Sequence, residues 1–437
     1  MSLAAVDFDL AVGPERAVVS RLLEGPDPAA GYERLDDHRR RIRSCPEGGP
    51  WLIGVLQRSG LRGRGGAWFP TWRKWAAVAE RPHGRAVVVI NASEGEPLSA
   101  KDRVLLSLRP HLVFDGAVLA ADTLGADEVV VYLARGSRAT NQVVGRALRE
   151  RRSAHLAEPR IRVVHTAHRY VAGEASAVVR RISGGPAKPQ FTPPRTFERG
   201  VDNLPTLVQN TETLAHVALI ARYGSDWFRE LGTETSPGSA LMTLSGNVSR
   251  PGVYEVDLGA RLGGVLDAAG GTTSPARGAL LGGYFGTWLP ARSLRDVPLD
   301  AERLRDEHSA SLGCGVLAVL PEDACGVTEA ARILGYLAAE SAGQCGPCVN
   351  GLAALSTTMA RIAASSAVPT DLDRVRRWAG LIRGRGACHH PDGAVGQLAS
   401  ALTVFADHLD THLAGVRCRG HLTGGFPPPP ARARGWR

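Results

Sequence analysis

Residues 61–75 read Leu-Arg-Gly-Arg-Gly-Gly-Ala-Trp-Phe-Pro-Thr-Trp-Arg-Lys-Trp. Three glycines surround one arginine near the start of this stretch, as Gly63, Arg64, Gly65 and Gly66. Glycine lets a backbone adopt positive φ and approach a ligand without a Cβ in the way. The stretch predicts a helix from about Arg73, and a glycine loop that opens a helix offers N–H groups and a positive dipole end to a phosphate. A surface turn has the same composition, so the loop alone leaves both interpretations open.

The sequence around this loop alternates between two patterns. Apolar, β-branched runs predict buried parallel strands at 86–90, 128–133 and 161–165. Three-to-four spacing predicts helices at 111–123 and 139–150, and shorter helices at 15–23 and 51–59. This alternation indicates an α/β domain with a mainly parallel sheet, in which ligands bind beyond the carboxyl ends of the strands. We place the domain at residues 50–235, after a polar N-terminal segment at 1–49.

Polar motifs follow the predicted strands. Residues 91–103 read Asn-Ala-Ser-Glu-Gly-Glu-Pro-Leu-Ser-Ala-Lys-Asp-Arg, which puts Gly95 between the carboxylates of Glu94 and Glu96. These carboxylates could bind a cation, act as acid and base, accept hydrogen bonds from a sugar, or form a solvated acidic turn. Two further motifs contain Gly173 with Glu174 and Asn210 with Thr211. The Asn210 amide could contact a ligand, cap a helix, or do both.

The pattern changes after residue 236. Short strands at 241–246, 253–256 and 315–320 around a helix at 262–269 predict a small α+β module at 236–322, which we interpret as a spacing and packing unit. Four amphipathic segments, at 327–340, 351–364, 371–383 and 394–409, predict an antiparallel four-helix bundle at 323–420. The Pro- and Arg-rich tail at 421–437 is expected to be disordered.

Cysteine spacing in the predicted bundle suggests a metal centre. Cys345 and Cys348 are separated by two residues between the first two helices, and Cys388 follows near the end of the third helix, beside His389 and His390. Such thiolates can bind an iron–sulfur cluster, or zinc together with a histidine. Buried free thiols are the remaining alternative. The other cysteines lack ligand-like spacing and are interpreted as structural: Cys45, Cys314, Cys325 and Cys418.

Composition narrows the classes of function. The net charge is +9, but the basic residues are scattered and no motif supports nucleic-acid binding. No apolar run is long enough to span a bilayer, and the N-terminus has no export signal, so we expect a cytoplasmic protein without membrane insertion. Only three of the 52 basic residues are lysine: Lys74, Lys101 and Lys188. Their rarity indicates positions that need a compact ammonium.

Five motifs, in order over about residues 51–409, resemble those of the NADH-binding, 51-kDa-type flavoprotein subunit of respiratory complex I and its relatives in NAD-linked hydrogenases and formate dehydrogenases. The family loop reads G-R-G-G-A-G-F-P-T-G-x-K-W, and all three lysines match family lysines. Four departures stand out: tryptophan replaces glycine at Trp68 and Trp72, alanine replaces glutamate at Ala175, and alanine replaces the first cluster cysteine at Ala342.

The resemblance implies a Rossmann-like FMN domain, a β-grasp domain of the soluble-ligand-binding type, and a helical [4Fe–4S] domain. It implies that FMN and NADH are held by Gly63, Arg64, Gly65, Gly66, Lys74, Asn91, Glu94, Gly95, Glu96, Gly173, Glu174, Asn210 and Thr211. Three of the four family cysteines match, Cys345, Cys348 and Cys388, so the cluster could be [4Fe–4S], [3Fe–4S] or incomplete.

The implied reaction passes electrons from NADH through FMN to the cluster. The acceptor would be a ferredoxin-like or thioredoxin-like iron–sulfur subunit, which could place the chain at the periphery of a membrane complex. We assign no general base, because the resemblance implies direct transfer to the flavin. Two alternatives stay open: a scaffold that has lost cofactors, and a ferredoxin-linked flavin subunit that does not use NADH.

Overall fold

The computed structural model describes residues 17–42, 46–81, 85–418, 420, 425–429 and 435–436. The helix predicted at 15–23 is wrong for its described part. There the backbone N–H groups of Arg21, Leu22 and Leu23 all donate to the Glu255 carboxylate, at 2.8, 2.7 and 3.3 Å. Because this carboxylate satisfies the donors of consecutive residues, the segment binds to the second domain instead of coiling. Cys45 lies outside the described residues.

The first domain contains a four-stranded parallel sheet in the order β3-β2-β1-β4. Its strands are β1 (Ala86–Ala92), β2 (Ala126–Ala134), β3 (Arg160–Thr166) and β4 (Thr206–Asn210). Its helices are α1 (Leu35–Ile42), α2 (Trp51–Ser59), α3 (Thr71–Ala79), α4 (Lys101–Leu108), α5 (Pro110–Leu124), α6 (Arg138–Ser153), α7 (Ala175–Ile182) and α8 (Thr211–Arg229). The predicted α/β fold and its three predicted strands are confirmed.

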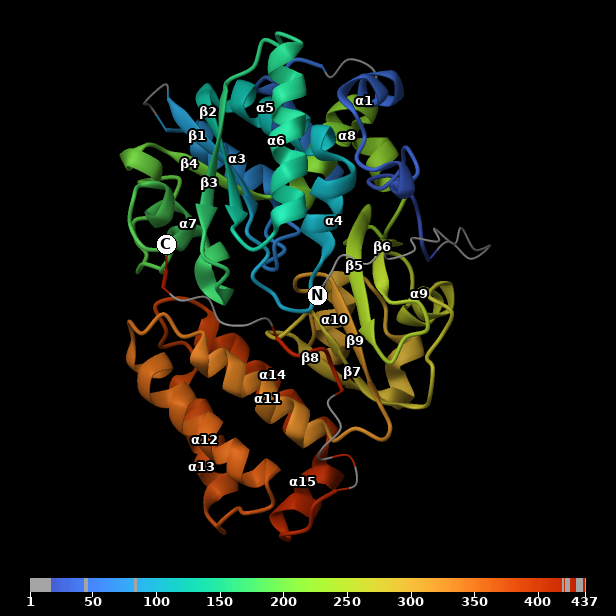
Figure 1. Cartoon of the computed structure of the whole chain (residues 1–437), viewed down its shortest axis with the longest axis vertical. Helices are drawn as coiled ribbons and strands as arrows, with labels where there is room; N and C mark the ends of the chain where they lie inside the picture. Colours follow the sequence, from blue (N-terminus) through green and yellow to red (C-terminus); the bar gives the residue numbers. More distant parts are fainter. Residues whose placement is uncertain are drawn as a thin grey trace.

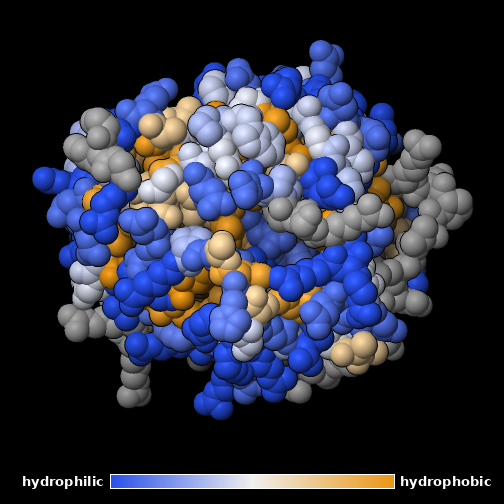
Figure 2. Space-filling model, turned by 90° about the horizontal axis from the view of Figure 1, so that it is seen from above, coloured by the Kyte–Doolittle hydropathy of each residue, from blue (hydrophilic) through white to orange (hydrophobic). Residues whose placement is uncertain are grey.

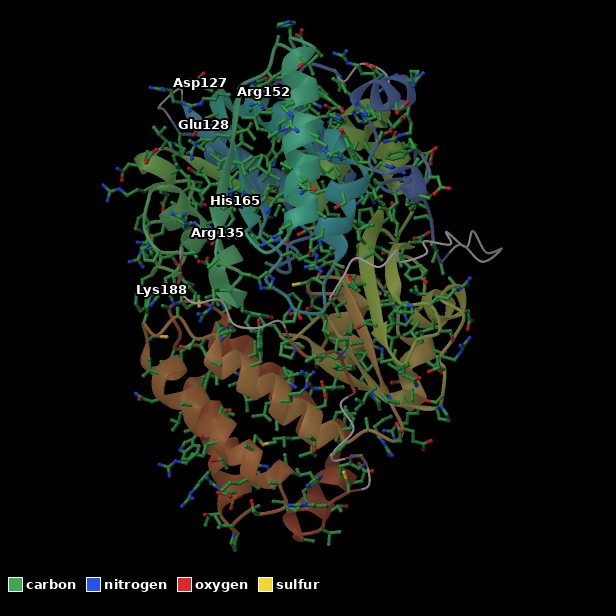
Figure 3. All side chains as sticks on the ribbon, viewed as in Figure 1. Asp127, Glu128, Arg135, Arg152, His165 and Lys188 are labelled. Carbon is green, nitrogen blue, oxygen red and sulfur yellow. The ribbon has the colours of Figure 1, made fainter. Side chains whose placement is uncertain are left out.

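Burial explains why β1 forms the centre of this sheet. Val88 and Ile90 pack on one face with the core of α5 and α8, while Val87 and Val89 pack on the other face against Val178 of α7. A strand buried on both faces needs the continuous β-branched run seen in the sequence. The carboxyl ends of β2 and β3, marked by Arg135 and His165, lie toward the helical domain, and Asp127 and Glu128 mark the opposite edge (Figure 3).

The second domain is a mixed five-stranded sheet in the order β6-β5-β9-β7-β8. Its elements are β5 (Ser239–Gly246), β6 (Gly252–Asp257), α9 (Leu262–Ala268), β7 (Ala276–Leu281), β8 (Thr287–Pro290), α10 (Ala301–His308) and β9 (Val316–Pro321). Strands β5 and β9 pair in parallel at its centre, and the other pairs are antiparallel. The strands and the helix predicted for the α+β module are confirmed.

The third domain consists of helices packed below the first domain and beside the second (Figure 1). They are α11 (Gly326–Ala339), α12 (Ala353–Ala363), α13 (Asp371–Ile382), α14 (His390–Val404) and α15 (Ala406–Leu413), with a π-helical turn at Pro347–Leu352 before α12. The single helix predicted at 394–409 is wrong, because the chain bends at Phe405 (φ −111°, ψ 35°). The ring of Phe405 is buried at this bend against Trp288, with ring centroids 4.9 Å apart.

The C-terminal tail is packed where the structure describes it, so the expected disorder is wrong at these residues. Phe426 is buried and stacks on Trp288, with ring centroids 5.6 Å apart. Trp436 lies on the first domain, where the guanidinium of Arg169 is 4.0 Å and the ammonium of Lys188 is 5.2 Å from its ring. The carbonyl oxygen of Trp436 also accepts a hydrogen bond from Ala187, at 2.7 Å.

The face of the molecule seen in Figure 2 is largely hydrophilic, and apolar side chains gather there only in hollows and small patches. Among the described residues, no single helix is long and apolar enough to cross a membrane. Helices α4 and α5 reach that length only as a pair, and they meet at an angle of 97°.

Candidate functional site

Two asparagines mark the point where the strand order of the first sheet reverses. The chain proceeds from β1 through β2 to β3 on one side, and β4 then returns to the other side of β1. Asn91 and Asn210 are register partners at the carboxyl ends of β1 and β4. Ligands of open α/β sheets bind outside this reversal point. The structure therefore places both predicted asparagines at the part of the sheet best suited to a ligand.

Hydrogen bonds tie neighbouring motifs to these asparagines. The Asn91 side-chain amide donates to the carbonyl of Gly173 at 2.8 Å, and Thr211 donates to the backbone carbonyl of Asn91 at 3.3 Å. The Asn210 amide oxygen accepts from the N–H of Glu212 at 3.0 Å, and its nitrogen donates to Asp102 at 2.7 Å. The helix-capping interpretation of Asn210 is thus confirmed.

The glycine loop lies directly over Asn210. The N–H of Gly63 donates to the carbonyl of Phe69 at 2.8 Å, which closes the loop before α3 begins. A Cβ added at Gly65 would lie 3.2 Å from the Asn210 Cβ, and Gly66 has a φ of +109°. Side chains at these positions would therefore press on Asn210 or strain the backbone. The structure thus brings Gly63, Gly65 and Gly66 together with the carboxyl end of β4.

Arg64 points into the protein instead of outward. Its side chain donates to the Ser239 carbonyl at 3.0 Å, and its backbone N–H donates to Thr213 at 2.8 Å. Its guanidinium lies 4.4 Å from the centroid of the Trp68 ring. Burial lowers the pKa of Arg64 to about 10. The side chain of Arg64 therefore holds the loop to β5, and only its backbone lies in the glycine loop.

Trp68 adopts a positive φ, a conformation that glycine reaches without strain. Its φ is +51°, and its indole packs in the core of the second domain, where Nε1 donates to the carbonyl of Gly313 at 3.0 Å. A bulky residue at positive φ is strained and persists only where its surroundings hold it. The tryptophan thus locks the loop to the β-grasp sheet. Trp72, the second substituted glycine position, packs partly buried against the core of the first domain.

Lys74 and Lys101 differ in their partners. Lys101 is buried, and its ammonium lies 2.7 Å from Glu212 and 3.1 Å from Asp102. Lys74 is half-buried on α3, and burial lowers its pKa. Within the described residues it makes no hydrogen bond and no ion pair. A desolvated ammonium without an anion, next to a glycine loop, suits a phosphate.

The two glutamates after β1 are structural as well as polar, so the solvated-turn interpretation is wrong. The Glu94 carboxylate caps α4 by accepting from the N–H groups of Asp102 and Arg103, at 3.0 and 3.2 Å. Glu96 is buried and accepts from the Tyr170 hydroxyl at 2.9 Å and the Tyr284 N–H at 2.8 Å. Gly95 lies so close to the backbone of Tyr170 that a Cβ would be 2.6 Å from its carbonyl oxygen.

Replacement of Glu96 by glutamine should flatten the dependence of stability on pH. Burial raises the pKa of Glu96 from 4.5 to about 7, with Glu94 adding to the rise and donors on Tyr170, Tyr284 and Leu98 opposing it. Because the folded-state pKa is raised, the protonated carboxyl of Glu96 contributes to the stability of the folded protein. This contribution is fully present below pH 4.5 and is lost as the pH rises through 7. The loss in wild type should reach about 3 kcal/mol.

Urea unfolding between pH 4.5 and 8 measures this effect. Glu80→Gln, at an exposed position of the same domain, serves as the control and should keep the wild-type slope. If the free energy of unfolding of Glu96→Gln changes with pH as steeply as that of wild type, another group controls the pH dependence.

Glu174 caps the next helix. Its carboxylate accepts from the N–H groups of Ser176 and Ala177 at the start of α7, at 3.0 and 3.2 Å. Ala175 is the first residue of that helix and packs partly buried against the second core of the sheet. Glu174 therefore acts as a helix cap, and the next residue, Ala175, carries no carboxylate.

The three predicted metal ligands meet around one small cavity. Cys345, Cys348 and Cys388 all line it, and Ala342 and His390 are among the other lining residues. Cys348 lies in the π-helical turn before α12, and Cys388 precedes α14. Burial raises the pKa of Cys348 to about 12 and that of Cys388 to about 11. The antiparallel return of the helices thus brings the distant cysteine to the pair, as the spacing predicts.

The two neighbouring histidines differ in position. The side chain of His389 is 100% exposed, and its ring lies 3.5 Å from Asp392. His390 is buried, and its Nε2 donates to the Leu337 carbonyl at 2.8 Å. That bond leaves Nδ1 unprotonated and, in the described part of the chain, without a hydrogen-bond partner. Only His390 therefore presents a buried free acceptor at the cysteine cavity.

Tyr170 connects the glutamate loop with the cysteine cavity. Its hydroxyl donates to Glu96, and its ring lies edge-on to His390, with centroids 5.7 Å apart. Its N–H donates to Glu340 at 2.8 Å, and Arg169 donates to the same carboxylate at 2.9 Å. Tyr170 lies three residues before Gly173 and Glu340 five residues before Cys345, but nothing in the sequence pattern shows that Tyr170 and Glu340 would meet. Tyr170 thus contacts both predicted sites, through Glu96 of the glutamate loop and through His390 at the cysteine cavity.

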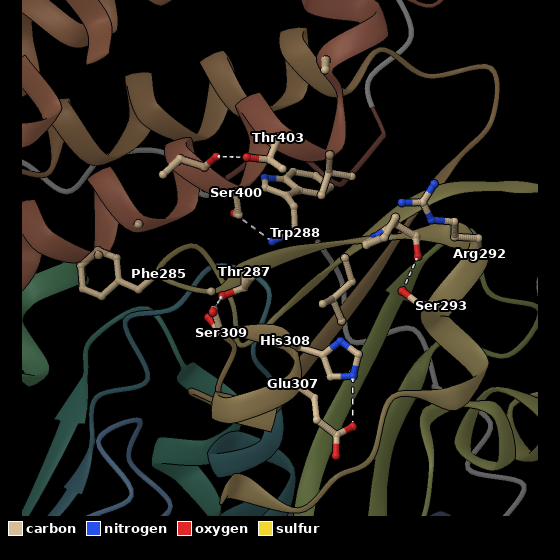
Figure 4. Close-up of a pocket in the computed structure, with 18 of the residues that line it drawn as sticks. Phe285, Thr287, Trp288, Arg292, Ser293, Glu307, His308, Ser309, Ser400 and Thr403 are labelled. Atoms are coloured by element: carbon tan, nitrogen blue, oxygen red, sulfur yellow. Dashed lines mark hydrogen bonds and ion pairs between the residues drawn. The ribbon is translucent and has the colours of Figure 1, made fainter. Parts of the chain in front are cut away.

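A separate cavity of about 950 Å³ lies between the second and third domains (Figure 4). Trp288, Arg292, His308, Ser400 and Thr403 are among its lining residues, which come from β8, α10, α14 and the adjoining turns. None of the residues that the sequence predicts for a cofactor or a metal lines this cavity. Size alone therefore does not identify the functional site of this protein.

Three family models match the chain, in the order of its domains. The model described as "Nuo51 FMN-binding domain" matches residues 56–219, the "SLBB domain" model matches 241–283, and the "NADH-ubiquinone oxidoreductase-F iron-sulfur binding region" matches 328–412. The last two models assign the β-grasp sheet to the SLBB class and the helical domain to an iron–sulfur region.

Similar proteins span nearly the whole chain. The F subunit of NADH-quinone oxidoreductase from Streptomyces coelicolor is 33% identical over 426 residues, which cover 93% of this chain and 89% of the relative. The HndC subunit of the NADP-reducing hydrogenase from Solidesulfovibrio fructosivorans is 30% identical, over 85% of this chain and 78% of its own. The H2-reduced NAD+-reducing [NiFe]-hydrogenase structure matches at 31% identity and a TM-score of 0.75, over 83% of this chain and 62% of that chain.

Identity at this level along 93% of the chain, together with three matching domains, settles the relationship. The predicted cofactor types, FMN and an iron–sulfur cluster, agree with the domain types. The chain belongs to the family of the 51-kDa-type flavoprotein, the F subunit of NADH-quinone oxidoreductase.

Proposed function

We propose that this chain is the electron-input subunit of a larger oxidoreductase and oxidises NADH at the reversal point of its parallel sheet. The observation that carries the proposal is the meeting of three features there. They are the paired asparagines Asn91 and Asn210, the glycine loop lying on them, and the start of α3 directly after that loop. Helix α3 carries the half-buried Lys74, which has no anion among the described residues. Together these features form a polar site that suits a phosphate-bearing ligand.

FMN fits this site. The backbone of Gly63–Gly66 can approach a ring or phosphate closely because no Cβ intervenes, and Lys74 supplies the compact positive charge. When bound, FMN supplies the conversion of two-electron into one-electron transfer, and the cluster supplies one-electron transport. The contributions of the protein are binding, orientation and exclusion of water. The buried carboxyl of Glu96 and the Glu94 cap hold the loop that borders this site.

The cysteine cavity fits an iron–sulfur cluster with three protein thiolates. Cys345, Cys348 and Cys388 line one wall, and Ala342 stands at the position of the missing fourth cysteine. We propose that electrons leave from here to an iron–sulfur partner subunit of ferredoxin-like or thioredoxin-like type. Through such partners the chain would lie at the periphery of a membrane complex, on its cytoplasmic side.

The absorption spectrum of protein purified without oxygen tests the function. We expect bound flavin and iron, and bleaching of the flavin by NADH at a rate slower than that of the relatives, since Ala175 lacks the family carboxylate. Flavin that is bleached by a reduced ferredoxin but not by NADH would favour the ferredoxin-linked alternative. A colourless protein that takes up neither cofactor would contradict the proposal.

Lys74→Ala should weaken FMN retention at least about tenfold, or by about 1.4 kcal/mol. The reason is that Lys74 is the half-buried ammonium beside the loop that lacks an ion-pair partner among the described residues. Titration of the stripped protein with FMN, followed by flavin fluorescence, measures the change.

Arg73→Ala serves as the control, because Arg73 is exposed on the same helix one residue away. This variant should bind FMN like wild type. Equal FMN affinity of wild type and Lys74→Ala would remove Lys74 from the site.

A further inference from the structure

A second cluster of cysteine and histidine side chains lies in the helical domain, apart from the cysteine cavity described above. The ligand atoms of Cys325, His408 and Cys418 all lie within 4.8 Å of one another. In addition, the sulfur of Cys325 lies 3.2 Å from Nε2 of His412. Cys325 and Cys418 are interpreted as structural thiols from the sequence, because 82 residues separate Cys325 from the nearest of these histidines.

The distances suit a tetrahedral metal ion. Zinc binds sulfur at about 2.3 Å and imidazole nitrogen at about 2.0–2.1 Å, so neighbouring ligand atoms lie about 3.3–3.8 Å apart around it. The 3.2 Å separation of Cys325 and His412 is close to this range, and the 4.8 Å limit for Cys325, His408 and Cys418 needs a contraction of about 1.5 Å at most. Side-chain rotation alone can supply such a change. His412 is placed at the site by its contact with Cys325 alone.

Three parts of the fold position the four residues: the start of α11, helix α15 and the segment after α15. Cys325 is the N-cap of α11, where its sulfur accepts from the Thr328 N–H at 3.4 Å. His408 and His412 lie one turn apart on α15, so both project from the same face of that helix. Cys418 follows in the segment after α15, and α15 packs on both α11 and α12. The cluster is thus the place where the end of the domain meets its beginning.

The hydrogen bonds around His412 select the tautomer that a metal requires. Ser365 has one hydroxyl hydrogen, and its oxygen lies 2.9 Å from the carbonyl of Val416, which can only accept. The Ser365 oxygen is therefore free to accept from Nδ1 of His412, which is also 2.9 Å away. Nε2 of His412 then carries a lone pair directed toward Cys325. Metal-binding histidines are commonly held in this way by a hydrogen bond at the other nitrogen.

His408 provides an independent indication of a ligand. Its Nδ1 atom is buried and makes no hydrogen bond to any described residue. Buried polar atoms without partners are rare in folded proteins, and each needs an explanation such as an ion or a water molecule. His408 is also one of the three residues whose ligand atoms converge.

We propose that Cys325, His408, His412 and Cys418 bind one zinc ion in a closed structural site. Two thiolates and two imidazoles in a tetrahedral set are a donor combination that zinc favours. The ion would tie the segment after α15 to the start of α11. It would thereby fix the origin of the tail whose Phe426 packs on Trp288 and whose Trp436 lies on the first domain.

Metal analysis of the full chain, purified without oxygen, tests the proposal. We expect about one zinc per chain in addition to iron. Cys418→Ala and His412→Ala should lose at least about nine-tenths of the zinc and keep the iron, while Cys345→Ala should lose iron and keep zinc. Asp410→Ala is the matched control, because Asp410 is exposed on α15 between the two histidines, and it should retain both metals.

Cobalt replacement gives a second measurement that does not depend on the variants folding. Co²⁺ added to zinc-stripped wild type should give the visible and thiolate-to-metal absorption bands of a tetrahedral site. Three results would overturn the proposal: no zinc and no cobalt bands in wild type, a disulfide between Cys325 and Cys418 in protein kept without oxygen, or zinc that is lost in Cys345→Ala but kept in Cys418→Ala.

Discussion

Replacing Lys101 with methionine is expected to lower the free energy of unfolding by about 3–5 kcal/mol, because it removes the nearest cation from two buried carboxylates. Lys101 is 3% exposed and lies 2.7 Å from Glu212 and 3.1 Å from Asp102, which are themselves 1% and 5% exposed. Methionine has a similar length but no charge, so the change removes the ion pairs and little of the packing. The carboxylates would then remain desolvated or take up protons.

The stability lost in Lys101→Met should depend on pH in a characteristic way. Burial is the largest influence on the pKa of Glu212 and would raise it, but Lys101, His216 and Arg64 together outweigh burial and lower the pKa from 4.5 to about 2. A lowered pKa contributes stability that is present above pH 4.5 and is lost as the pH falls toward 2. The difference between wild type and Lys101→Met should therefore be greatest near neutral pH and shrink during acidification below pH 4.5.

Urea unfolding at pH 7 measures the effect, and two further variants control it. Lys101→Met with Glu212→Gln should recover part of the loss, because the second change removes a stranded charge. Lys188→Met should cost about 1 kcal/mol or less, because its contact is a cation–π interaction with Trp436. If Lys101→Met unfolds like wild type, the ammonium at this position is not structural.

The difference between Lys101 and Lys74 shows how far sequence patterns reach. Three lysines among 52 basic residues indicate positions that need an ammonium, but the pattern does not say why. The structure gives Lys101 a buried ion-pair network, whereas Lys74 has no ion pair to any described residue. The partner of Lys101 is Glu212, 111 residues away, and such a pairing has no local signal in the sequence.

The features that could be predicted from the sequence are those that follow from local sequence patterns. Strand β1 follows from a continuous β-branched run, and the meeting of Cys345, Cys348 and Cys388 follows from helices that return antiparallel. The incorrect predictions have a different cause, since in each case the local structure depends on a residue that is distant in the sequence. Glu255 prevents a helix at the N-terminus, and Trp288 receives Phe405 and Phe426. Sequence periodicity has no information on such contacts.

Ala342→Cys is expected to change the cluster from one that loses iron in air to one that keeps about four irons per chain. Ala342 lines the same cavity as the three cysteines, so a thiol there would reach the corner that the chain leaves without a cysteine. With a cluster bound in wild type, that corner would be left to water, a small ligand or Nδ1 of His390. Loss of one iron on oxidation would give [3Fe–4S], which electron paramagnetic resonance distinguishes from the reduced four-iron cluster.

Iron and acid-labile sulfide, measured before and after exposure to air, follow the change. Cys348→Ala should remove the cluster completely, because two protein thiolates hold a four-iron cluster poorly. His390→Ala tests the imidazole as the fourth ligand, and His389→Ala is its matched control, since the exposed ring of His389 does not line the cavity. If only His390→Ala speeds the loss of iron, His390 is the ligand, and Ala342→Cys should then relieve the need for it. If Ala342→Cys and wild type both purify without iron and sulfide, the cavity has lost its metal function, and the structural-scaffold alternative gains instead.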